Sequence, residues 1–262
     1  MKSITSSHNP LFKELKAIAT TNKARREYGQ TLLEGLHLTQ SYLDKGLKPE
    51  LCIVSEASAE HDDVVQVVQR AAGMGVQRLM ISNAQYKMLS SVENGIGVLL
   101  LVAIPDVSDA PQLSDTALLL DGVQDPGNMG AILRTAAAAG VTTIYCSQTT
   151  TAAWSPKVLR VGMVAHVGLT IYESVDLAAL VAGASVPVFA TTLQATQSIY
   201  QADLTQPAAW IVGNEGQGVS DDLLTDAVTQ VIIPQSDGVE SLNVAAATAV
   251  CLFEQRRQAA TK

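Results

Sequence analysis

The sequence predicts an α/β protein with a small N-terminal domain and a larger C-terminal domain built on a parallel sheet. The chain has 262 residues, enough for one large domain or two ordinary ones. Apolar residues make up 47% and charged residues 16%, which excludes a disordered chain, and 4% aromatic residues disfavour an aromatic-rich β-sandwich. Short apolar runs alternate with helical patterns, as is typical of sheets that are covered by helices.

The first predicted element is a helix that starts at Asn9 and Pro10, because Asn caps helices well and Pro is tolerated at the first helical position. A helix that continues to about residue 23 would pack an apolar face and leave Lys13, Lys16 and Lys23 in solvent. Further short apolar runs and amphipathic patterns predict a small α/β domain, with strands at 31–34, 51–54, 79–81 and 98–104 and helices at 36–43 and 64–72.

A change of composition separates this N-terminal domain, residues 1–104, from the rest of the chain. Residues 105–116 are rich in Pro, Asp and Ser and have no periodicity, so they predict a linker. The domain at 117–262 then alternates continuously apolar strands with helices, the pattern of a parallel sheet that is buried on both faces. Its predicted strands are 117–120, 143–146, 167–172, 186–190, 209–212 and 231–233, and its helices are 129–139, 157–164, 177–181 and 244–257.

The charge of the chain is unevenly distributed. The net charge of −8 and the pI of about 4.9 argue against nucleic acid as a partner of the whole surface. Residues 1–48, however, carry eight Lys or Arg against four acids, a net charge of +4, whereas the other 214 residues carry nine bases against 21 acids, a net charge of −12. A polyanion should therefore meet the N-terminal end, unless these basic helices are merely solvated surfaces.

Cysteine usage and hydropathy predict a soluble cytoplasmic protein. The cysteines, Cys52, Cys146 and Cys251, are far apart and lie in apolar contexts, so they are expected as buried thiols rather than disulfides or metal ligands. The start of the chain has no apolar run typical of a signal peptide, and the longest apolar run, 98–104, is too short to span a bilayer. The four histidines show no spacing that predicts a metal site, and none is expected.

Three polar segments that contain glycine, at 118–136, 210–220 and 231–249, each follow or include a predicted strand. Open α/β sheets bind ligands beyond the carboxyl ends of their strands, so these segments are the candidate site. None carries GxxxxGK[ST] or GxGxxG, which disfavours a nucleoside triphosphatase and a nicotinamide-dependent enzyme. Glu215 in the second segment would repel a phosphate and favour a cation or a hydroxyl donor.

The polar residues of these segments have structural as well as functional interpretations. Asn128 could simply cap the helix that follows it, and Arg134 could be a surface residue or a placed cation, since no other charge lies between Asp125 and Lys157. Ser241 or Asn243 could cap the last helix, although one cap position cannot explain both residues.

The motifs DPGNMGAILRTA, GNEGQGVS and IPQSDGVESLNVA, in this order, closely resemble the three motifs of the SpoU (TrmH-type) branch of the SPOUT methyltransferases. The resemblance runs from residue 118 to about 254. The run NPLFKELKAIATTNKARREYGQTLLEGLHLT also resembles the RNA-recognition domain, similar to a ribosomal protein, that precedes the catalytic domain in many members. Where many relatives carry a second serine in the last motif, this chain has Ala245.

The resemblance implies an S-adenosylmethionine-dependent methyltransferase that acts on a ribose 2′-hydroxyl of structured RNA, ribosomal RNA more than transfer RNA. It implies a homodimer through the catalytic domain, a deep trefoil knot in that domain and no required metal. A catalytically inactive RNA-binding or assembly protein on the same fold is the alternative. Carried over by position, the catalytic residues are Asn128, Arg134, Glu215, Ser241 and Asn243; the cofactor-binding residues are Thr192, Gly213, Ile233 and Leu242; the RNA-binding residues are Lys13, Lys16, Lys23, Arg25, Arg26 and Arg134.

Overall fold

The computed structural model describes residues 1–107, 112–236, 238 and 241–260, and it consists of two compact units. Unit 1 contains Met1–Asp106 and Trp154–Val164, and unit 2 contains Val107–Ala153 and Ala165–Lys262. The predicted domains are two consecutive blocks separated by residues 105–116, and no sequence pattern indicates that 154–164 belongs with unit 1. Residues 108–111 of that predicted linker lie outside the described residues.

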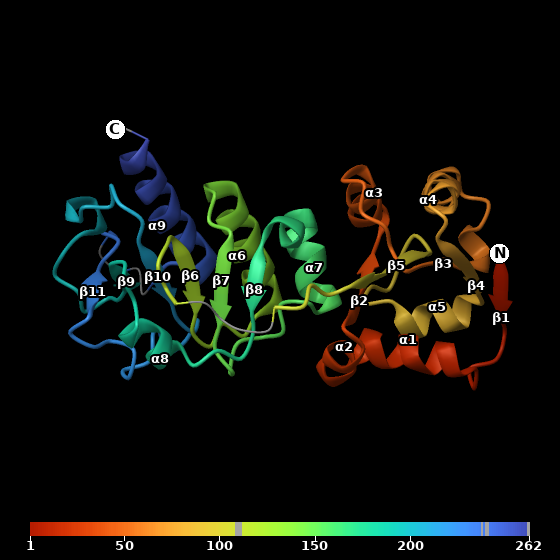
Figure 1. The fold of residues 1–262 in the computed structure, drawn as a ribbon, viewed down its shortest axis with the longest axis horizontal. Coiled ribbons are helices and arrows are strands. Elements are labelled where there is room, and N and C mark those ends of the chain that lie inside the picture. The colour runs from red at the N-terminus through yellow and green to blue at the C-terminus, as the bar shows by residue number, and fades with distance from the viewer. Residues whose placement is uncertain (108–111, 237, 239–240, 261–262) are drawn as a thin grey trace. The chain divides into compact units, whose positions relative to one another are not determined.

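Unit 1 is a five-stranded mixed sheet in the order β1-β4-β3-β5-β2, with helices on both faces. In Figure 1, α1, α2 and α5 lie on one side of this sheet, and α3 and α4 lie on the other. The strands are β1 (Lys2–Ile4), β2 (Gln30–Glu34), β3 (Leu51–Ser55), β4 (Gln77–Ile81) and β5 (Val98–Ala103), and the helices are α1 (Pro10–Thr20), α2 (Asn22–Tyr28), α3 (Leu36–Asp44), α4 (Asp62–Gly73) and α5 (Asn83–Leu89). The sequence patterns predict neither β1 nor α5, because both elements are short.

The predicted first helix is in fact two helices. It ends at Thr20, and the Thr21 side chain caps α2 by accepting a hydrogen bond of 3.2 Å from the N–H of Ala24. Arg25, on α2, is only 6% exposed, and its Nη1 donates to the carbonyl of Ile18 at 2.9 Å. This guanidinium therefore closes the turn between the two helices, so the predicted RNA-binding residue Arg25 is a buried one.

The returning segment packs α7 (Pro156–Gly162) against β2, an edge strand of the unit 1 sheet. The Thr31 hydroxyl donates to the carbonyl of Trp154 at 2.7 Å, and Nη1 of Arg160 donates to the hydroxyl of Ser91 at 3.0 Å. Ser91 in turn donates its N–H to the buried carboxylate of Glu34 at 2.8 Å. Because this segment adds two bases, unit 1 holds 13 of the 17 Lys and Arg residues.

Unit 2 is a six-stranded sheet in the order β11-β9-β10-β6-β7-β8, and every pair is parallel, which confirms the predicted class. The helices α6 and α9 pack against each other beside this sheet (Figure 1). The strands are β6 (Ala117–Leu120), β7 (Thr143–Cys146), β8 (Thr170–Tyr172), β9 (Val188–Thr191), β10 (Ala209–Val212) and β11 (Val228–Val231); the helices are α6 (Pro126–Ala139), α8 (Leu177–Ala182) and α9 (Val244–Ala259).

The last strand lies earlier than predicted, at 228–231 instead of 231–233. The apolar pair Ile232 and Ile233 misled the sequence interpretation, because these residues leave the sheet. Ile232 pairs with the segment beside Ser198 instead: its N–H donates to the carbonyl of Gln197 at 2.9 Å, and its carbonyl accepts from Ile199 at 2.9 Å. This displaced segment forms part of the candidate site.

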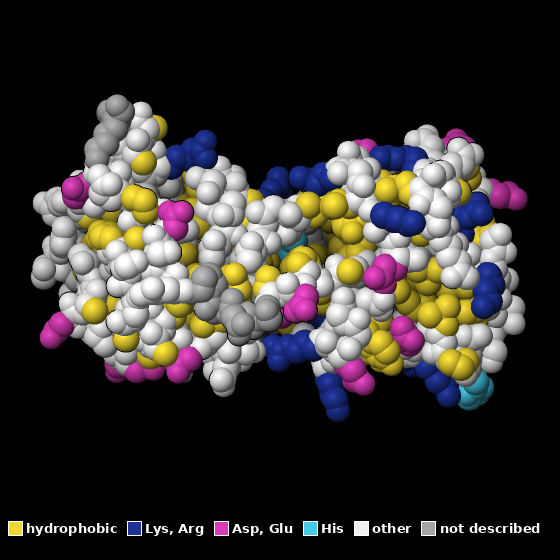
Figure 2. Space-filling view, in the orientation of Figure 1, with side chains coloured by type: hydrophobic (Ala, Val, Ile, Leu, Met, Phe, Trp, Pro, Cys, Tyr) yellow, Lys and Arg dark blue, Asp and Glu magenta, His cyan; other side chains and the backbone are white. Residues whose placement is uncertain are grey.

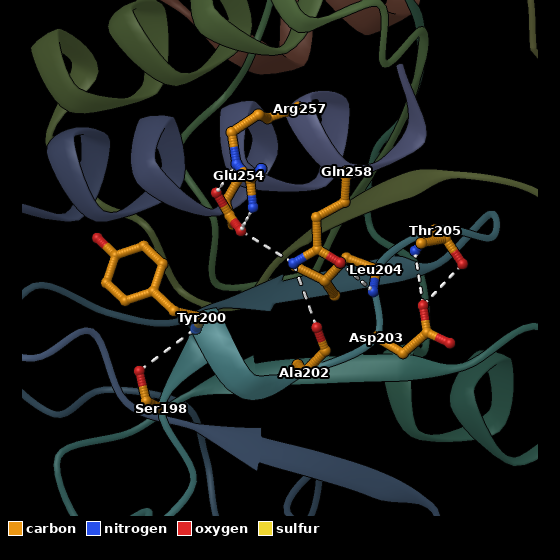
Figure 3. Close-up of polar contacts among 9 residues, drawn as sticks. All are labelled: Ser198, Tyr200, Ala202, Asp203, Leu204, Thr205, Glu254, Arg257 and Gln258. Atoms are coloured by element: carbon orange, nitrogen blue, oxygen red, sulfur yellow. Dashed lines mark hydrogen bonds and ion pairs between the residues drawn. The ribbon is translucent and has the colours of Figure 1, made fainter. Parts of the chain in front are cut away.

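Side chains of α9 fasten it to the loop between β9 and β10 (Figure 3). Gln258 accepts from the N–H of Leu204 at 2.9 Å and donates to Glu254 at 2.9 Å. Glu254 also receives two hydrogen bonds from Arg257, at 2.7 and 2.8 Å. The hydrogen bonds from Arg257 and then from Gln258 lower the pKa of Glu254 to about 2, against the opposing effect of burial.

Replacing the Glu254 carboxylate should make the stability of the fold less dependent on pH in the acidic range. A carboxyl whose pKa falls from 4.5 to about 2 on folding stabilises the folded state above pH 4.5, and this contribution is lost as the pH falls towards 2. We expect Glu254→Gln to melt at a lower temperature than the wild type at pH 7, and the two melting temperatures to converge near pH 2. Thermal unfolding followed by circular dichroism from pH 7 to pH 2 measures the two melting temperatures. A difference between them that does not change with pH would contradict the lowered pKa of Glu254.

The remaining sequence expectations concern thiols, metal ligands and membrane helices. Cys52, Cys146 and Cys251 are all free and buried, as predicted, and burial raises the pKa of each thiol, that of Cys52 to about 12. Among the residues that the structure describes, no three His, Cys, Asp or Glu side chains group as metal ligands. The described helices include none with the length and hydropathy needed to cross a membrane.

Candidate functional site

The three polar segments of unit 2 meet around one cavity of about 880 Å³. Its wall is formed by residues 191–194 at the end of β9 and directly after it, by the loop 213–219 after β10, by the segment that follows β11 and by residues 241–244 at the start of α9. Asn128, in the first turn of α6, completes it. Residues that are far apart in the sequence are therefore neighbours, because the parallel strands end at the same edge of the sheet.

A chain of hydrogen bonds joins the three motifs on the wall of this cavity. The Asn128 amide Nδ2 donates to Oε1 of Glu215 at 3.0 Å, and Asn243 Nδ2 donates to Oδ1 of Asn128 at 2.9 Å. The backbone N–H groups of Gln124 and Asp125 donate to the two oxygens of Glu215, each at 3.2 Å. Three of the five predicted catalytic residues are thus in direct contact.

The groups at the two ends of this hydrogen-bond chain determine how its amide side chains are oriented. Asn243 caps α9, and its Oδ1 accepts from the N–H groups of Ala245 at 2.9 Å and Ala246 at 3.3 Å. Its Nδ2 must therefore face Asn128, whose oxygen accepts. At the other end, an ionised Glu215 can only accept, so Asn128 must present its Nδ2 there. Both amide orientations follow from these partners.

Asn128 does not cap α6, contrary to the structural interpretation of the sequence. The cap is Asp125, whose Oδ1 accepts from the N–H of Asn128 at 2.8 Å, with Pro126 at the first helical position. The Asn128 side chain is therefore available for the contacts with Glu215 and Asn243. At the start of α9 the structure decides between the two candidate caps. Asn243 is the cap, and Ser241 is an exposed residue of the cavity wall.

Glu215 is held as a carboxylate by its donors. Burial acts to raise the pKa of this group and is the largest single influence. The hydrogen bonds from Asn128 and from backbone N–H groups, those of Gln124 and Asp125 among them, together outweigh burial, so the pKa of Glu215 lies below its usual value of 4.5. At neutral pH the cavity wall therefore carries a negative charge, which favours a cationic ligand.

The loop at 213–219 closes tightly on itself. Asn214 and Gly218 exchange backbone hydrogen bonds of 2.9 Å, which brings the backbone of Gly218 against Gly213. A Cβ added to Gly213 would lie 2.1 Å from the carbonyl carbon of Gly218, so no other residue fits there. The Asn214 side chain accepts from the N–H groups of Gly216 and Gln217 and donates to the carbonyl of Gly122 at 2.8 Å. Sequence reasoning missed Asn214, although an Asn two residues before a Gly is a turn signal.

All four predicted cofactor-binding residues, Thr192, Gly213, Ile233 and Leu242, line the cavity. Thr192 can offer a ligand only acceptors, its carbonyl and the oxygen of its hydroxyl, because both of its donors are used. Its N–H donates to Val231 at 3.0 Å and its hydroxyl donates to Gln230 at 3.4 Å. Leu242 is 37% exposed, an accessible apolar surface at the cavity.

Arg134 lies apart from this group. It is exposed on α6, it does not line the cavity, and within the described part of the chain it has no hydrogen-bond or ion-pair partner. The basic residues predicted to bind RNA belong to unit 1. Of these, the exposed ones are Lys13, Lys16, Lys23 and Arg26, whereas Arg25 is buried.

Comparison with known proteins agrees with this arrangement of motifs. A family model described as the SpoU rRNA Methylase family matches residues 115–253. The chain belongs to this family. A second model, described as an MRM3-like substrate binding domain, matches residues 9–99.

Relatives of this family cover nearly the whole chain. An uncharacterized tRNA/rRNA methyltransferase of Synechocystis is 36% identical over 98% of this chain and 94% of its own length. The 23S rRNA (guanosine(2553)-2′-O)-methyltransferase RlmP of Bacillus subtilis is 30% identical over 98% of this chain and its full length. The crystal structure of an AdoMet-bound rRNA methyltransferase from Sinorhizobium meliloti is 30% identical, with a TM-score of 0.80 over 98% of this chain and 97% of that one.

Proposed function

We propose that this protein transfers a methyl group from S-adenosylmethionine to a ribose 2′-hydroxyl of ribosomal RNA. The observation that carries the proposal is the chain Glu215–Asn128–Asn243, which brings three motifs of the family together on one cavity wall. Two relatives that match 98% of the chain agree with it, a tRNA/rRNA methyltransferase and a 23S rRNA (guanosine(2553)-2′-O)-methyltransferase. An inactive RNA-binding protein would not need this arrangement, so we do not favour that alternative.

The cavity is suited to S-adenosylmethionine. Its volume of about 880 Å³ is within the range of small-molecule sites, and its wall combines apolar side chains such as Leu193 and Leu242 with amides and a carboxylate. When bound, the cofactor supplies an electrophilic methyl group on a cationic sulfur. The ionised Glu215 gives the wall a charge complementary to that cation.

The side chains of the site orient groups more than they exchange protons. Asn128 and Asn243 use their amide groups to connect Glu215 to the N-terminus of α9, which holds the three segments in register. The exposed Ser241 hydroxyl is available to position the ribose. Orientation of the attacking oxygen can supply much of the rate of such a transfer. The proton of that oxygen would leave to the RNA phosphate beside it or to water.

We further propose that Arg134 holds the RNA phosphate beside the target ribose, through two parallel hydrogen bonds from its guanidinium group. We expect Arg134→Lys to slow single-turnover methyl transfer by about 10-fold or more, because an ammonium cannot make the paired contact. Binding of the cofactor should not change, since Arg134 lies outside the cavity. Rapid-quench assays with labelled cofactor measure the transfer rate, and transfer at the wild-type rate would exclude the paired contact.

Methylation of defined transcripts tests the proposed reaction directly. The purified protein, methyl-labelled S-adenosylmethionine and either a 23S rRNA or a tRNA transcript should give label in the rRNA. Nuclease digestion should recover that label in a 2′-O-methylated nucleotide. Label on a base would mean a different reaction, and no label with any RNA would refute the proposal.

RNA recognition is assigned to unit 1, and we further propose a homodimer through unit 2 in the cytoplasm. Unit 1 carries the exposed bases of α1 and α2, whereas unit 2 has four bases against 14 acids.

The dimer, the domain limits and the knot stay predictions. An exposed aromatic side chain on α9, Phe253 at 46%, is consistent with a second copy on unit 2, and sedimentation velocity would measure the dimer.

A further inference from the structure

The loop between α5 and β5, residues 90–97, contains the one Asn-Gly pair of the sequence, Asn94-Gly95. Such a pair is chemically labile, because glycine has no side chain to hinder attack by its backbone nitrogen on the preceding side-chain amide. The other asparagines all precede residues with side chains; they are Asn9, Asn22, Asn83, Asn128, Asn214 and Asn243. Asn94 is therefore the candidate for this reaction.

The structure leaves the Asn94 side chain unrestrained. Asn94 is exposed and lies in a turn at residues 93–94, and its amide has no hydrogen-bond partner within the described part of the chain. The amides of Asn128, Asn214 and Asn243, by contrast, are all held by hydrogen bonds. Exposed segments with few hydrogen bonds change conformation at the lowest free-energy cost, so Asn94 can reach the geometry for attack.

The same loop is fastened to a buried carboxylate. Glu34, only 4% exposed, accepts from the N–H of Ser91 at 2.8 Å, from the hydroxyl of Ser91 at 2.5 Å and from the hydroxyl of Tyr86 at 3.4 Å. Gly95 lies against this group: a Cβ added to it would be 2.7 Å from the Tyr86 hydroxyl oxygen and 3.2 Å from Oε1 of Glu34. The backbone at Gly95 therefore has no room for an added atom.

We propose that Asn94 is a site of spontaneous deamidation, independently of the proposed function. The backbone nitrogen of Gly95 forms a bond to Cγ of Asn94, and the bond from Cγ to the side-chain nitrogen breaks. That nitrogen leaves as ammonia, with the proton of the Gly95 N–H. Water then opens the resulting succinimide ring at one of its two carbonyl groups, which gives aspartate or isoaspartate. Both products carry a new negative charge, and the backbone of isoaspartate is longer by one carbon.

The isoaspartyl product changes how unit 1 holds the returning segment. The extra backbone carbon displaces Gly95, which is already packed against Tyr86 and Glu34. The loop then loosens from Glu34, and with it Ser91, whose hydroxyl accepts from Nη1 of Arg160 on α7 at 3.0 Å. Deamidation at Asn94 therefore weakens the attachment of residues 154–164 to unit 1.

Peptide mass spectrometry of the aged full-length protein tests the reaction itself. After incubation in mildly alkaline buffer, in which the backbone nitrogen loses its proton more readily, electron-transfer fragmentation should locate isoaspartate at position 94. The rate in the folded protein should lie within about 10-fold of the rate in urea, because the turn is exposed and unrestrained. Asn94→Gln is the control and should remain unmodified, since glutamine would have to form a larger ring. Reaction in urea but none in the folded protein, or faster reaction at another asparagine, would overturn the proposal.

Hydrogen exchange tests the structural consequence. Peptides that cover 90–97 and 154–164 should exchange faster in the aged wild type than in fresh protein, and aged Asn94→Gln should exchange like fresh protein. Asn94→Asp adds the charge without the extra backbone carbon, so it should also exchange like fresh wild type. Unchanged exchange of 154–164 in the isoaspartyl protein would refute the link to α7. Equally fast exchange in Asn94→Asp would refute the role of the longer backbone.

Discussion

Gly213→Ala should abolish cofactor binding and destabilise the fold. The added Cβ would lie 2.1 Å from the carbonyl carbon of Gly218, and backbone atoms cannot move aside as a side-chain tip can. The loop would have to open at its Asn214–Gly218 pairing, which removes one wall of the cavity. We expect a loss of about 3 kcal/mol in the free energy of unfolding, at the upper end for an overpacked site.

Gly216→Ala is the control for this substitution, because the same loop has room there. The nearest atom to its added Cβ is the Asn214 side-chain oxygen at 3.6 Å, an ordinary contact, and Gly216 does not have a positive φ. Urea unfolding and calorimetry with S-adenosylhomocysteine should give values near the wild type for Gly216→Ala. If Gly213→Ala bound the ligand with wild-type affinity, the closed loop would not be the cofactor wall.

Asn128→Asp should slow methyl transfer by on the order of 100-fold at neutral pH. The substitution replaces the donor Nδ2, which lies 3.0 Å from Glu215, by a second acceptor of the same size. Two carboxylates at this distance repel, and the pKa of one of them must rise. The chain that joins the three motifs would then be broken at its centre.

The pH dependence of the rate distinguishes repulsion between the two carboxylates from a general structural effect of the substitution. As the pH falls below the raised pKa, a proton can bridge the two carboxyl groups, so transfer by Asn128→Asp should recover towards the wild-type rate. Single-turnover rates as a function of pH measure this. Gln217→Glu is the control for charge, since it adds a carboxylate to an exposed residue of the same wall. A deficit in Asn128→Asp that does not change with pH would contradict the proposed role of the contact.

Local patterns predicted the elements of unit 2 well where strands are buried on both faces. The runs at 117–120, 143–146 and 209–212 are continuously apolar, and the observed strands have these bounds. Prediction was wrong where apolar residues serve another purpose, as at 232–233. These residues leave the sheet, and Ile232 pairs with the segment at Ser198. It missed β1, because three residues at the edge of a sheet carry too little pattern.

The candidate site was predictable as a set of motifs but not as an arrangement. Each motif has local features that the sequence shows, such as the turn before α6 and the cap of α9. The contacts between motifs join residues 87 and 115 positions apart, so no local pattern could indicate which amide faces which carboxylate.

By itself, the sequence determined the class of the fold, the three motifs and the basic N-terminal end, because these depend on residue type and spacing along the chain. Only the tertiary structure decided that Asp125 and not Asn128 caps α6, that Arg25 is buried, and that residues 154–164 pack with unit 1. The physical reason is the same in each case. A polar side chain takes whichever partner folding brings within hydrogen-bond distance, and an apolar segment packs against whichever surface lies uncovered beside it.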